Sequence, residues 1–176
     1  MAEGTEPRGR GARIWRAIAL LLIGGVFCAG FGVVLGFFLF PFVFPPPPGT
    51  DTITAEDSAS LVATGTFIHA DPSDPIHYGQ GKVSLYEQAV LLEPDFKVGP
   101  GPAYHVYLVP KATIRASSDV VDTMYVDLGA LRAFEGSQRY AIPAGVNLAD
   151  YKSVVIWSER FSVLISPADL EPATGG

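Results

Sequence analysis

An uninterrupted apolar run near the N-terminus constrains this chain more than any other feature. The run extends over 24 residues, from Ala17 to Phe40, without a charged side chain. As a helix with a rise of about 1.5 Å per residue, it is long enough to cross the roughly 30 Å hydrocarbon core of a bilayer. Four arginines precede it within residues 1–16, and such positive flanks stay cytoplasmic. We therefore expect a single-pass protein of the cell membrane, with a cytoplasmic N-terminus and an extracytoplasmic C-terminal part.

A cleaved signal peptide is the alternative interpretation of this run. The apolar part of a signal peptide is shorter, about 7 to 15 residues, and ends in a small-residue cleavage site. Here the apolar character continues through Phe42, Val43 and Phe44 into four prolines. This continuation favours an uncleaved anchor, residues 17–44, that contacts the lipid bilayer.

Small residues recur every four positions within the predicted anchor. They would lie on one helix face and would allow a second helix to approach closely. The pattern predicts a homodimer through this face, although glycine is also common in membrane helices for other reasons. The four positions are Gly24, Cys28, Gly32 and Gly36.

The remaining segments differ in composition and divide the chain. Residues 1–16 form a basic tail, 45–60 a Pro-rich stalk, 61–170 a domain and 171–176 a short tail. Beyond the basic tail the chain holds 8 basic and 16 acidic residues, and so acidic a surface is unsuited to nucleic acid. Cys28 is the only cysteine, which excludes an intrachain disulfide and a cysteine-based zinc site.

The domain has the sequence pattern of an all-β protein. Short β-branched and aromatic runs alternate with Gly and Pro, which predicts an antiparallel β-sandwich or partly closed barrel. A single helical turn is expected at Asn147–Tyr151. The predicted strands are Leu61–Ala70, Lys82–Glu87, Ala89–Leu92, Ala103–Val109, Met124–Asp127, Gln138–Ile142, Val154–Trp157 and Phe161–Ile165.

The last two runs flank the polar break Ser158-Glu159-Arg160. This arrangement predicts a hairpin or a bent central strand, with the break at its tight end. Any chemical centre is expected near Trp157 and Ser158. Domain tyrosines beside Trp157 could line a small apolar cleft, or could simply lie at strand edges.

Several motifs, in this order, resemble the DM-thirteen domain, a family labelled as electron-transfer domains. The resemblance covers nearly the whole predicted domain and implies a redox or redox-accessory role. The motifs are Gly65-Thr66-Phe67, His77-Tyr78-Gly79-Gln80-Gly81-Lys82-Val83, Leu91-Leu92-Glu93-Pro94-Asp95-Phe96, Gly101-Pro102-Ala103-Tyr104-His105-Val106-Tyr107-Leu108, Asp127-Leu128-Gly129, Gly136-Ser137-Gln138-Arg139-Tyr140-Ala141-Ile142-Pro143 and Tyr151 to Val163.

The resemblance also implies that the family's redox role depends on a cysteine directly after the closing tryptophan. This chain has Ser158 there, and a hydroxyl cannot form a disulfide or a sulfenic acid. We therefore expect a non-enzymatic binding or redox-accessory module. The open alternatives are an electron-transfer protein with a bound metal or haem, and a surface protein that self-associates through its membrane helix.

The remaining candidate site residues lie inside the family motifs. His77 and His105, with an aspartate such as Asp95, could bind a divalent metal, because imidazole and carboxylate suit several such ions. The alternative is that His77 is a loop residue bonded to backbone, that His105 is a strand residue and that Asp95 is a turn residue before a core aromatic, Phe96. Ser158 lacks the G-x-S-x-G context of a hydrolase nucleophile, so no catalytic residue is predicted.

Overall fold

The computed structural model describes residues 10–54 and 60–173. The predicted tail at 1–16 lies mostly outside this range, as do residues 55–59 of the predicted stalk and the last three residues of the chain. The chain divides into two compact units, residues 1–43 and 44–176, and each is described by itself.

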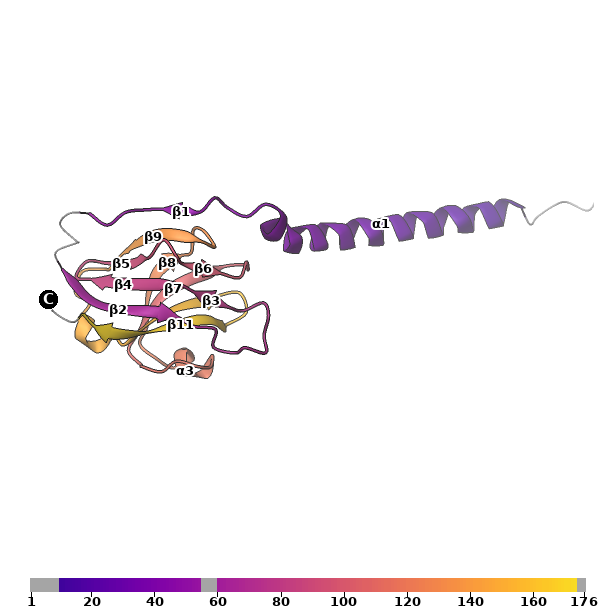
Figure 1. Cartoon of the computed structure of the whole chain (residues 1–176). Helices are drawn as coiled ribbons and strands as arrows, with labels where there is room; N and C mark the ends of the chain where they lie inside the picture. The colour runs from indigo at the N-terminus through magenta and orange to yellow at the C-terminus, as the bar shows by residue number, and fades with distance from the viewer. Residues whose placement is uncertain (1–9, 55–59, 174–176) are drawn as a thin grey trace, which may run out of the picture. The chain divides into compact units, whose positions relative to one another are not determined.

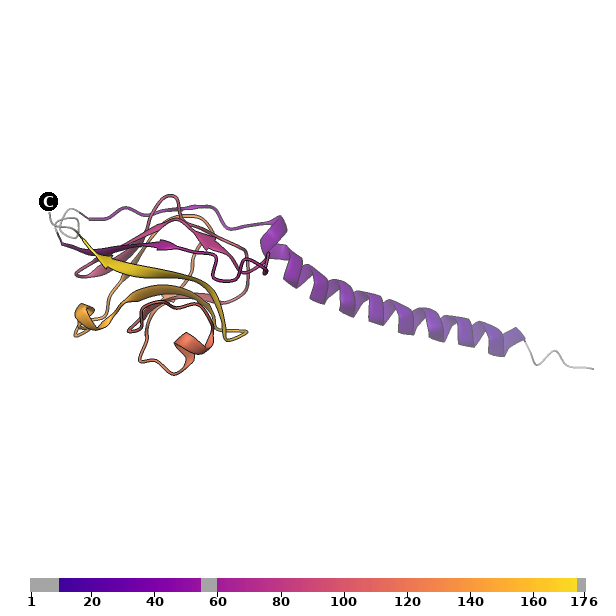
Figure 2. The same ribbon diagram turned by 60° about the horizontal axis from the view of Figure 1, so that its bottom comes forward.

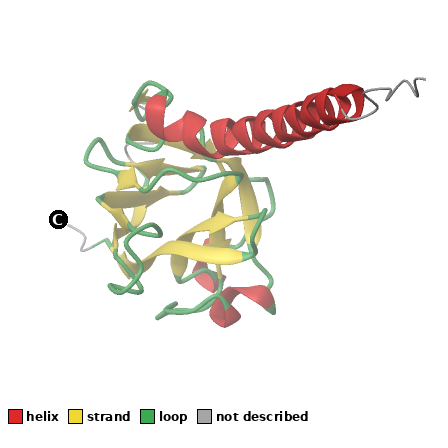
Figure 3. Ribbon diagram, turned by 90° about the vertical axis from the view of Figure 1, so that its right-hand side faces the viewer, coloured by secondary structure: helices red, strands yellow, loops and turns green. Residues whose placement is uncertain are grey.

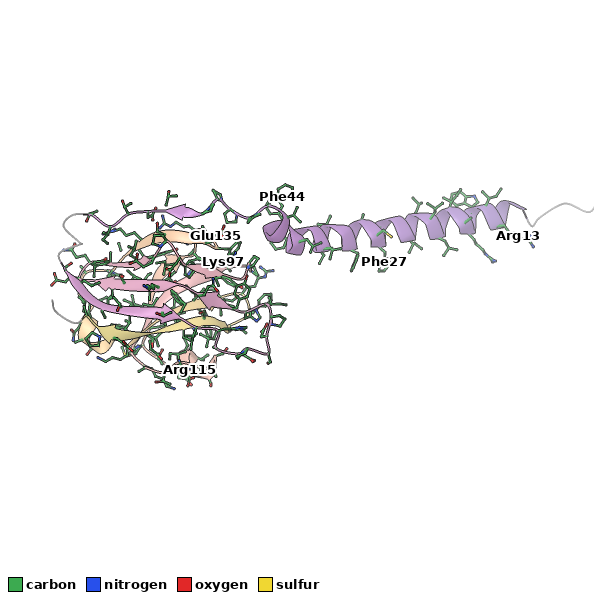
Figure 4. The ribbon with its side chains drawn as sticks, in the orientation of Figure 1. Arg13, Phe27, Phe44, Lys97, Arg115 and Glu135 are labelled. Atoms are coloured by element: carbon green, nitrogen blue, oxygen red, sulfur yellow. The ribbon has the colours of Figure 1, made fainter. Side chains whose placement is uncertain are left out.

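The first unit is one long helix, α1 (Arg10–Val43). Within its segment Arg13–Phe37, a window of 18 residues has a mean hydropathy of 2.6, and the described side chains are exposed, as Figure 4 shows around Arg13 and Phe27. The prolines from Pro45 to Pro48 follow after one residue and prevent the helix from continuing, because proline has no N–H to donate. The helix is therefore long and apolar enough to span a membrane.

The second unit is mostly β-structure, drawn in yellow in Figure 3. Its helical elements are only α3 (Ser118–Val121) and the 3-10 turn η1 (Leu148–Asp150) among the described residues. The strands are β1 (Gly49–Thr50), β2 (Leu61–Phe67), β3 (Gly79–Gln80), β4 (Lys82–Tyr86), β5 (Ala89–Leu92), β6 (Lys97–Val98), β7 (Tyr104–Val109), β8 (Val126–Ala130), β9 (Gly136–Ala141), β10 (Ser153–Ser158) and β11 (Val163–Pro172).

Nine of these strands form one curled sheet, a half-barrel (Figure 1). Their order is β1-β9-β5-β4-β2-β11-β10-β7-β8, and β3 pairs separately with β6. All neighbours are antiparallel except β1, which runs parallel to β9. The all-β prediction is therefore confirmed, and of its two forms the structure adopts the partly closed barrel.

Both faces of the sheet are covered at its β11-β10-β7 part. The inner face carries the main core, which includes Phe96, Val106 and Ile156. On the outer face α3 and the chain leading to it cover a second, smaller core, with Ile114 and Val120 contributed by that segment (Figure 2). Every residue of β10 is buried as a result, which explains the unbroken apolar run from Val154 to Trp157.

Most predicted strands are confirmed, but several details were wrong. The strand predicted at 124–127 runs instead over Val126–Ala130. The predicted strand at 61–70 ends at Phe67, and the predicted strand at 161–165 begins only at Val163 and continues to Pro172. Phe161 lies in the hairpin turn and is half exposed. The two-residue strands and α3 were missed, because elements so short carry no periodicity. The β10–β11 hairpin and the helical turn η1 are confirmed.

Oppositely charged pairs fasten several loops to the sheet. Lys97 Nζ lies 3.5 Å from a carboxylate oxygen of Glu135, and the two residues are labelled side by side in Figure 4. On the opposite side of the domain, Arg115 reaches Asp169 of β11, with 2.8 Å between guanidinium nitrogen and carboxylate oxygen. The Asp169 carboxylate also accepts hydrogen bonds from the Thr113 amide and the Ser153 hydroxyl.

The anchoring of Asp169 should make the stability of the domain depend on pH. Burial opposes ionisation of Asp169, but the hydrogen bonds from Arg115 and Thr113 outweigh it and hold the pKa below the ordinary 3.8. A carboxylate with a lowered pKa stabilises the fold above its unfolded pKa, and this contribution disappears as the pH falls through the folded value. The urea midpoint should therefore decrease as the pH is lowered below about 4. Asp169→Asn should lower the midpoint at pH 7 and flatten this slope. Equal slopes in both proteins would contradict the assignment.

Candidate functional site

Strand β7 presents two polar side chains on the outer face of the sheet. Its residues alternate, so that Tyr104 and Val106 enter the main core while His105 and Tyr107 point the other way. His105 lies opposite Trp157 of β10 and opposite Ala130 of β8. This alternation fixes where the imidazole emerges.

Asp127 of β8 faces the imidazole of His105. Its carboxylate oxygens lie 2.9 and 3.1 Å from His105 Nδ1, and one of them also accepts the Gly129 amide at 2.8 Å. Gly129 has φ +119°, a conformation that side chains disfavour, and the β7–β8 register shifts between His105 and Tyr107. This irregularity holds the Asp127 carboxylate in place beside the imidazole.

Glu159 reaches the same spot from the β10–β11 turn. Its backbone amide donates to Ala103 O at 3.0 Å, which ties the start of the turn to β7. The hydroxyl of Tyr107 donates to the Glu159 carboxylate. Burial raises the pKa of the Tyr107 phenol, and the hydrogen bond to Glu159 raises it further, so the phenol stays protonated and remains a donor.

Three aromatic rings form the floor of this surface. Tyr107 is fully buried and stacks on Tyr125, with centroids 4.3 Å apart and an interplanar angle of 8°. Its other neighbour is Trp157, 6.3 Å away at 24°. The stacked rings form an aromatic layer beneath the polar groups of this surface. We call the whole group the His105 cluster: His105, Tyr107, Tyr125, Asp127, Trp157 and Glu159.

The cluster has the donor atoms of a metal centre. One nitrogen or oxygen from each of His105, Asp127 and Glu159 lies within 4.8 Å of the others, and all three side chains reach solvent. Imidazole nitrogen and carboxylate oxygen together suit divalent first-row transition metals. No second group of this kind occurs within residues 10–54 and 60–173.

The predicted site residues separate into different places. Trp157 and His105 are neighbours in the cluster. Ser158 is the next residue of β10, opposite Tyr104, but it is fully buried and its hydroxyl lies 3.3 Å from Pro102 O, to which it donates. It does not lie at the exposed tight end of the hairpin, where the sequence placed it.

His77 and Asp95 have structural partners elsewhere in the domain. The His77 ring lies 2.5 Å from the Asp74 carboxylate, which also accepts two loop amides, one of them that of Ile76. Asp95 accepts the Lys82 amide at 2.9 Å beside the β4–β5 hairpin. Neither belongs to the His105 cluster. For the predicted helix contacts at Gly24, Cys28, Gly32 and Gly36, the self-association stays a prediction.

The alternative of an electron-transfer protein with a bound haem stays a prediction. A haem needs a largely apolar pocket and an axial ligand from histidine, cysteine, methionine or tyrosine. Two of the surface hollows contain charged side chains, Lys82 and Glu93 in one and Asp74 and Arg115 in the other, whereas a third is lined mainly by apolar residues and includes Tyr104. The rings of His69 and His77 are both held by Asp74, and His105 faces Asp127.

Sequence reasoning missed Tyr107, Asp127 and Glu159 as site residues. Asp127 lies 22 residues from His105, and Glu159 lies 52 residues from Tyr107. No motif spacing could have paired them. The only signal was that each lies in or beside a stretch already singled out, at the end of a predicted strand or at the hairpin break.

A comparison of the sequence with models of known protein families identifies the domain. The family model described as Electron transfer DM13 matches residues 73–170, which include β3 to β10 and most of β11. Similarity searches found no significant match among curated proteins or among solved structures. The match covers more than half of the chain and confirms the resemblance seen in the sequence. The chain therefore belongs to the Electron transfer DM13 family.

Proposed function

We propose that this protein is a membrane-tethered DM13 module that presents a ligand-binding surface outside the cytoplasm and assists electron transfer without a thiol in its domain. The observation that carries this proposal is the His105 cluster. It gathers an imidazole and two carboxylates on a floor of stacked rings. The long apolar helix α1, preceded by arginines, supports the tethering and the orientation.

The state of Ser158 supports an accessory role over thiol chemistry. The resemblance implies a redox cysteine at this position, and here the residue is a fully buried serine. Thiol chemistry requires a thiolate that a partner can reach. The only cysteine of the chain, Cys28, lies in α1. A redox partner would therefore meet the His105 cluster, which includes the residues on either side of Ser158, instead of a thiol.

Substituted cysteines test both parts of this proposal. In a Cys28→Ser background, Ser118→Cys places a thiol on the exposed surface of α3, and Ser158→Cys places one at the buried position. A membrane-impermeant maleimide added to intact spheroplasts should label the first variant. It should label the second only after denaturation, because a buried thiol is inert.

Two outcomes would contradict the proposal. Labelling of Ser118→Cys only after lysis would place the domain in the cytoplasm. Labelling of native Ser158→Cys at the rate of Ser118→Cys would show that this position is open to redox partners. Circular dichroism of both variants against the Cys28→Ser parent serves as the folding control.

A further inference from the structure

We propose that His105, Asp127 and Glu159 bind one divalent first-row transition-metal ion. The inference deepens the proposed function, because it names the ligand of the same surface. It does not require that the domain face outward, since metal binding depends on the cluster alone.

The distances allow coordination after small side-chain movements. Donor atoms around a tetrahedral ion with bonds of about 2.0–2.1 Å are roughly 3.4 Å apart. The His105–Asp127 pair is already closer than this, at 2.9 Å, and the three donors lie within 4.8 Å. Glu159 is exposed in a turn, so its carboxylate can close the remaining gap by rotation about its side-chain bonds. The ion would bind at His105 Nδ1 in place of the N–H proton that faces Asp127, and the neutral imidazole would then carry its proton on Nε2.

Hydrogen bonds around the donors orient them for an ion. The Gly129 amide holds one oxygen of Asp127, and the Tyr107 hydroxyl holds one oxygen of Glu159. Such outer contacts fix the orientation of metal ligands and typically change metal affinity by 10- to 100-fold. Tyr107 is itself fixed by burial and by its stacked neighbours. The two carboxylates are therefore held in place by hydrogen bonds from Gly129 and Tyr107. An ordinary pair of exposed carboxylates does not need such support.

The donor set also indicates the class of ion. Two carboxylates without an imidazole would suit Ca²⁺ or Mg²⁺, which prefer oxygen ligands. An imidazole nitrogen added to them shifts the preference to ions such as Co²⁺, Ni²⁺, Cu²⁺ and Zn²⁺. The two negative charges balance the charge of a divalent ion. We therefore expect Zn²⁺ and Co²⁺ to compete for one site, and Mg²⁺ and Ca²⁺ to compete poorly.

Trp157 provides a direct readout of binding at this place. It is the register partner of His105, and the only other tryptophan is Trp15 in α1. In the full chain with Trp15→Phe, in detergent, Co²⁺ should quench the fluorescence of Trp157 saturably with one-site stoichiometry. Zn²⁺ should reverse the quenching. His105→Ala and Asp127→Asn should each weaken binding at least about tenfold, and Tyr107→Phe about tenfold.

The matched control is His77→Ala, which removes the other carboxylate-paired imidazole. The affinity of His77→Ala for Co²⁺ should lie within about twofold of the parental affinity. This difference is smaller than the roughly 10- to 100-fold change expected when a hydrogen bond to a metal ligand is lost. Absence of saturable quenching in the parent, or parental affinity in Asp127→Asn and Glu159→Gln, would overturn the inference. These two exposed substitutions keep the test valid if His105→Ala misfolds. A negative result for metal binding would not change the labelling expected in spheroplasts. The two proposals can therefore be contradicted independently.

Discussion

Replacement of Gln138 by leucine should lower the free energy of unfolding by about 3 kcal/mol. Gln138 is 1% exposed, and its side-chain oxygen accepts hydrogen bonds from the amides of Arg132 and Ala133 and from the hydroxyl of Tyr140. Its side-chain nitrogen donates to Ala133 O at 2.8 Å. Leucine has nearly the same size but leaves the amide and the carbonyl of Ala133 unpaired, and each unpaired buried group costs about 1–3 kcal/mol.

Gln88→Leu is the matched control, because Gln88 is exposed in the β4–β5 turn. Its stability should stay within about 0.5 kcal/mol of the parent. Urea unfolding of the full chain in detergent, followed by near-ultraviolet circular dichroism, gives both values. A loss below about 1 kcal/mol for Gln138→Leu would mean that the loop before β9 does not depend on this side chain.

Phe96→Ala should destabilise the domain even more than Gln138→Leu, with a loss of about 3–5 kcal/mol. The ring is 1% exposed in the main core and meets Phe67 edge to face, with centroids 5.2 Å apart. Truncation to alanine loses the burial of the ring and leaves a cavity, since β2 and β4 hold the surrounding backbone.

Phe161→Ala makes the same chemical change at a site that is 51% exposed in the hairpin turn. It should cost less than about 1 kcal/mol. If the two alanine variants unfold at similar urea concentrations, the placement of Phe96 in the core and of Phe161 in the turn would be wrong.

These two phenylalanines show what local sequence can reveal about this fold. Phe96 follows a turn aspartate, Asp95, and its placement in the core was predicted. Phe161 was assigned to a strand, because an apolar run reads the same whether a turn or a strand begins it. The short β-branched and aromatic runs, with Gly and Pro residues between them, predicted most of the sheet. The short strands β1 and β6 exist only through pairing with distant partners, which no local pattern encodes.

The sequence predicted only some of the residues of the candidate site, for a related reason. His105 and Trp157 were singled out because they lie in recognisable motifs, and the register of β7 against β10 does bring them together. His77 looked equivalent to His105, yet it pairs with Asp74 in its own loop. Asp127 reaches the site because of the register between β7 and β8, and Glu159 reaches it because of the β10–β11 turn. Which carboxylate faces which imidazole is a property of the folded sheet.

The His105 cluster, and no thiol, should be the ligand site of this DM13 domain. Anomalous scattering at the zinc edge, from crystals of the full chain grown with Zn²⁺, tests this claim most directly. We expect one strong peak about 2.0–2.2 Å from a ring nitrogen of His105 and from carboxylate oxygens of Asp127 and Glu159. A peak between His77 and Asp74, or none at the cluster, would contradict it.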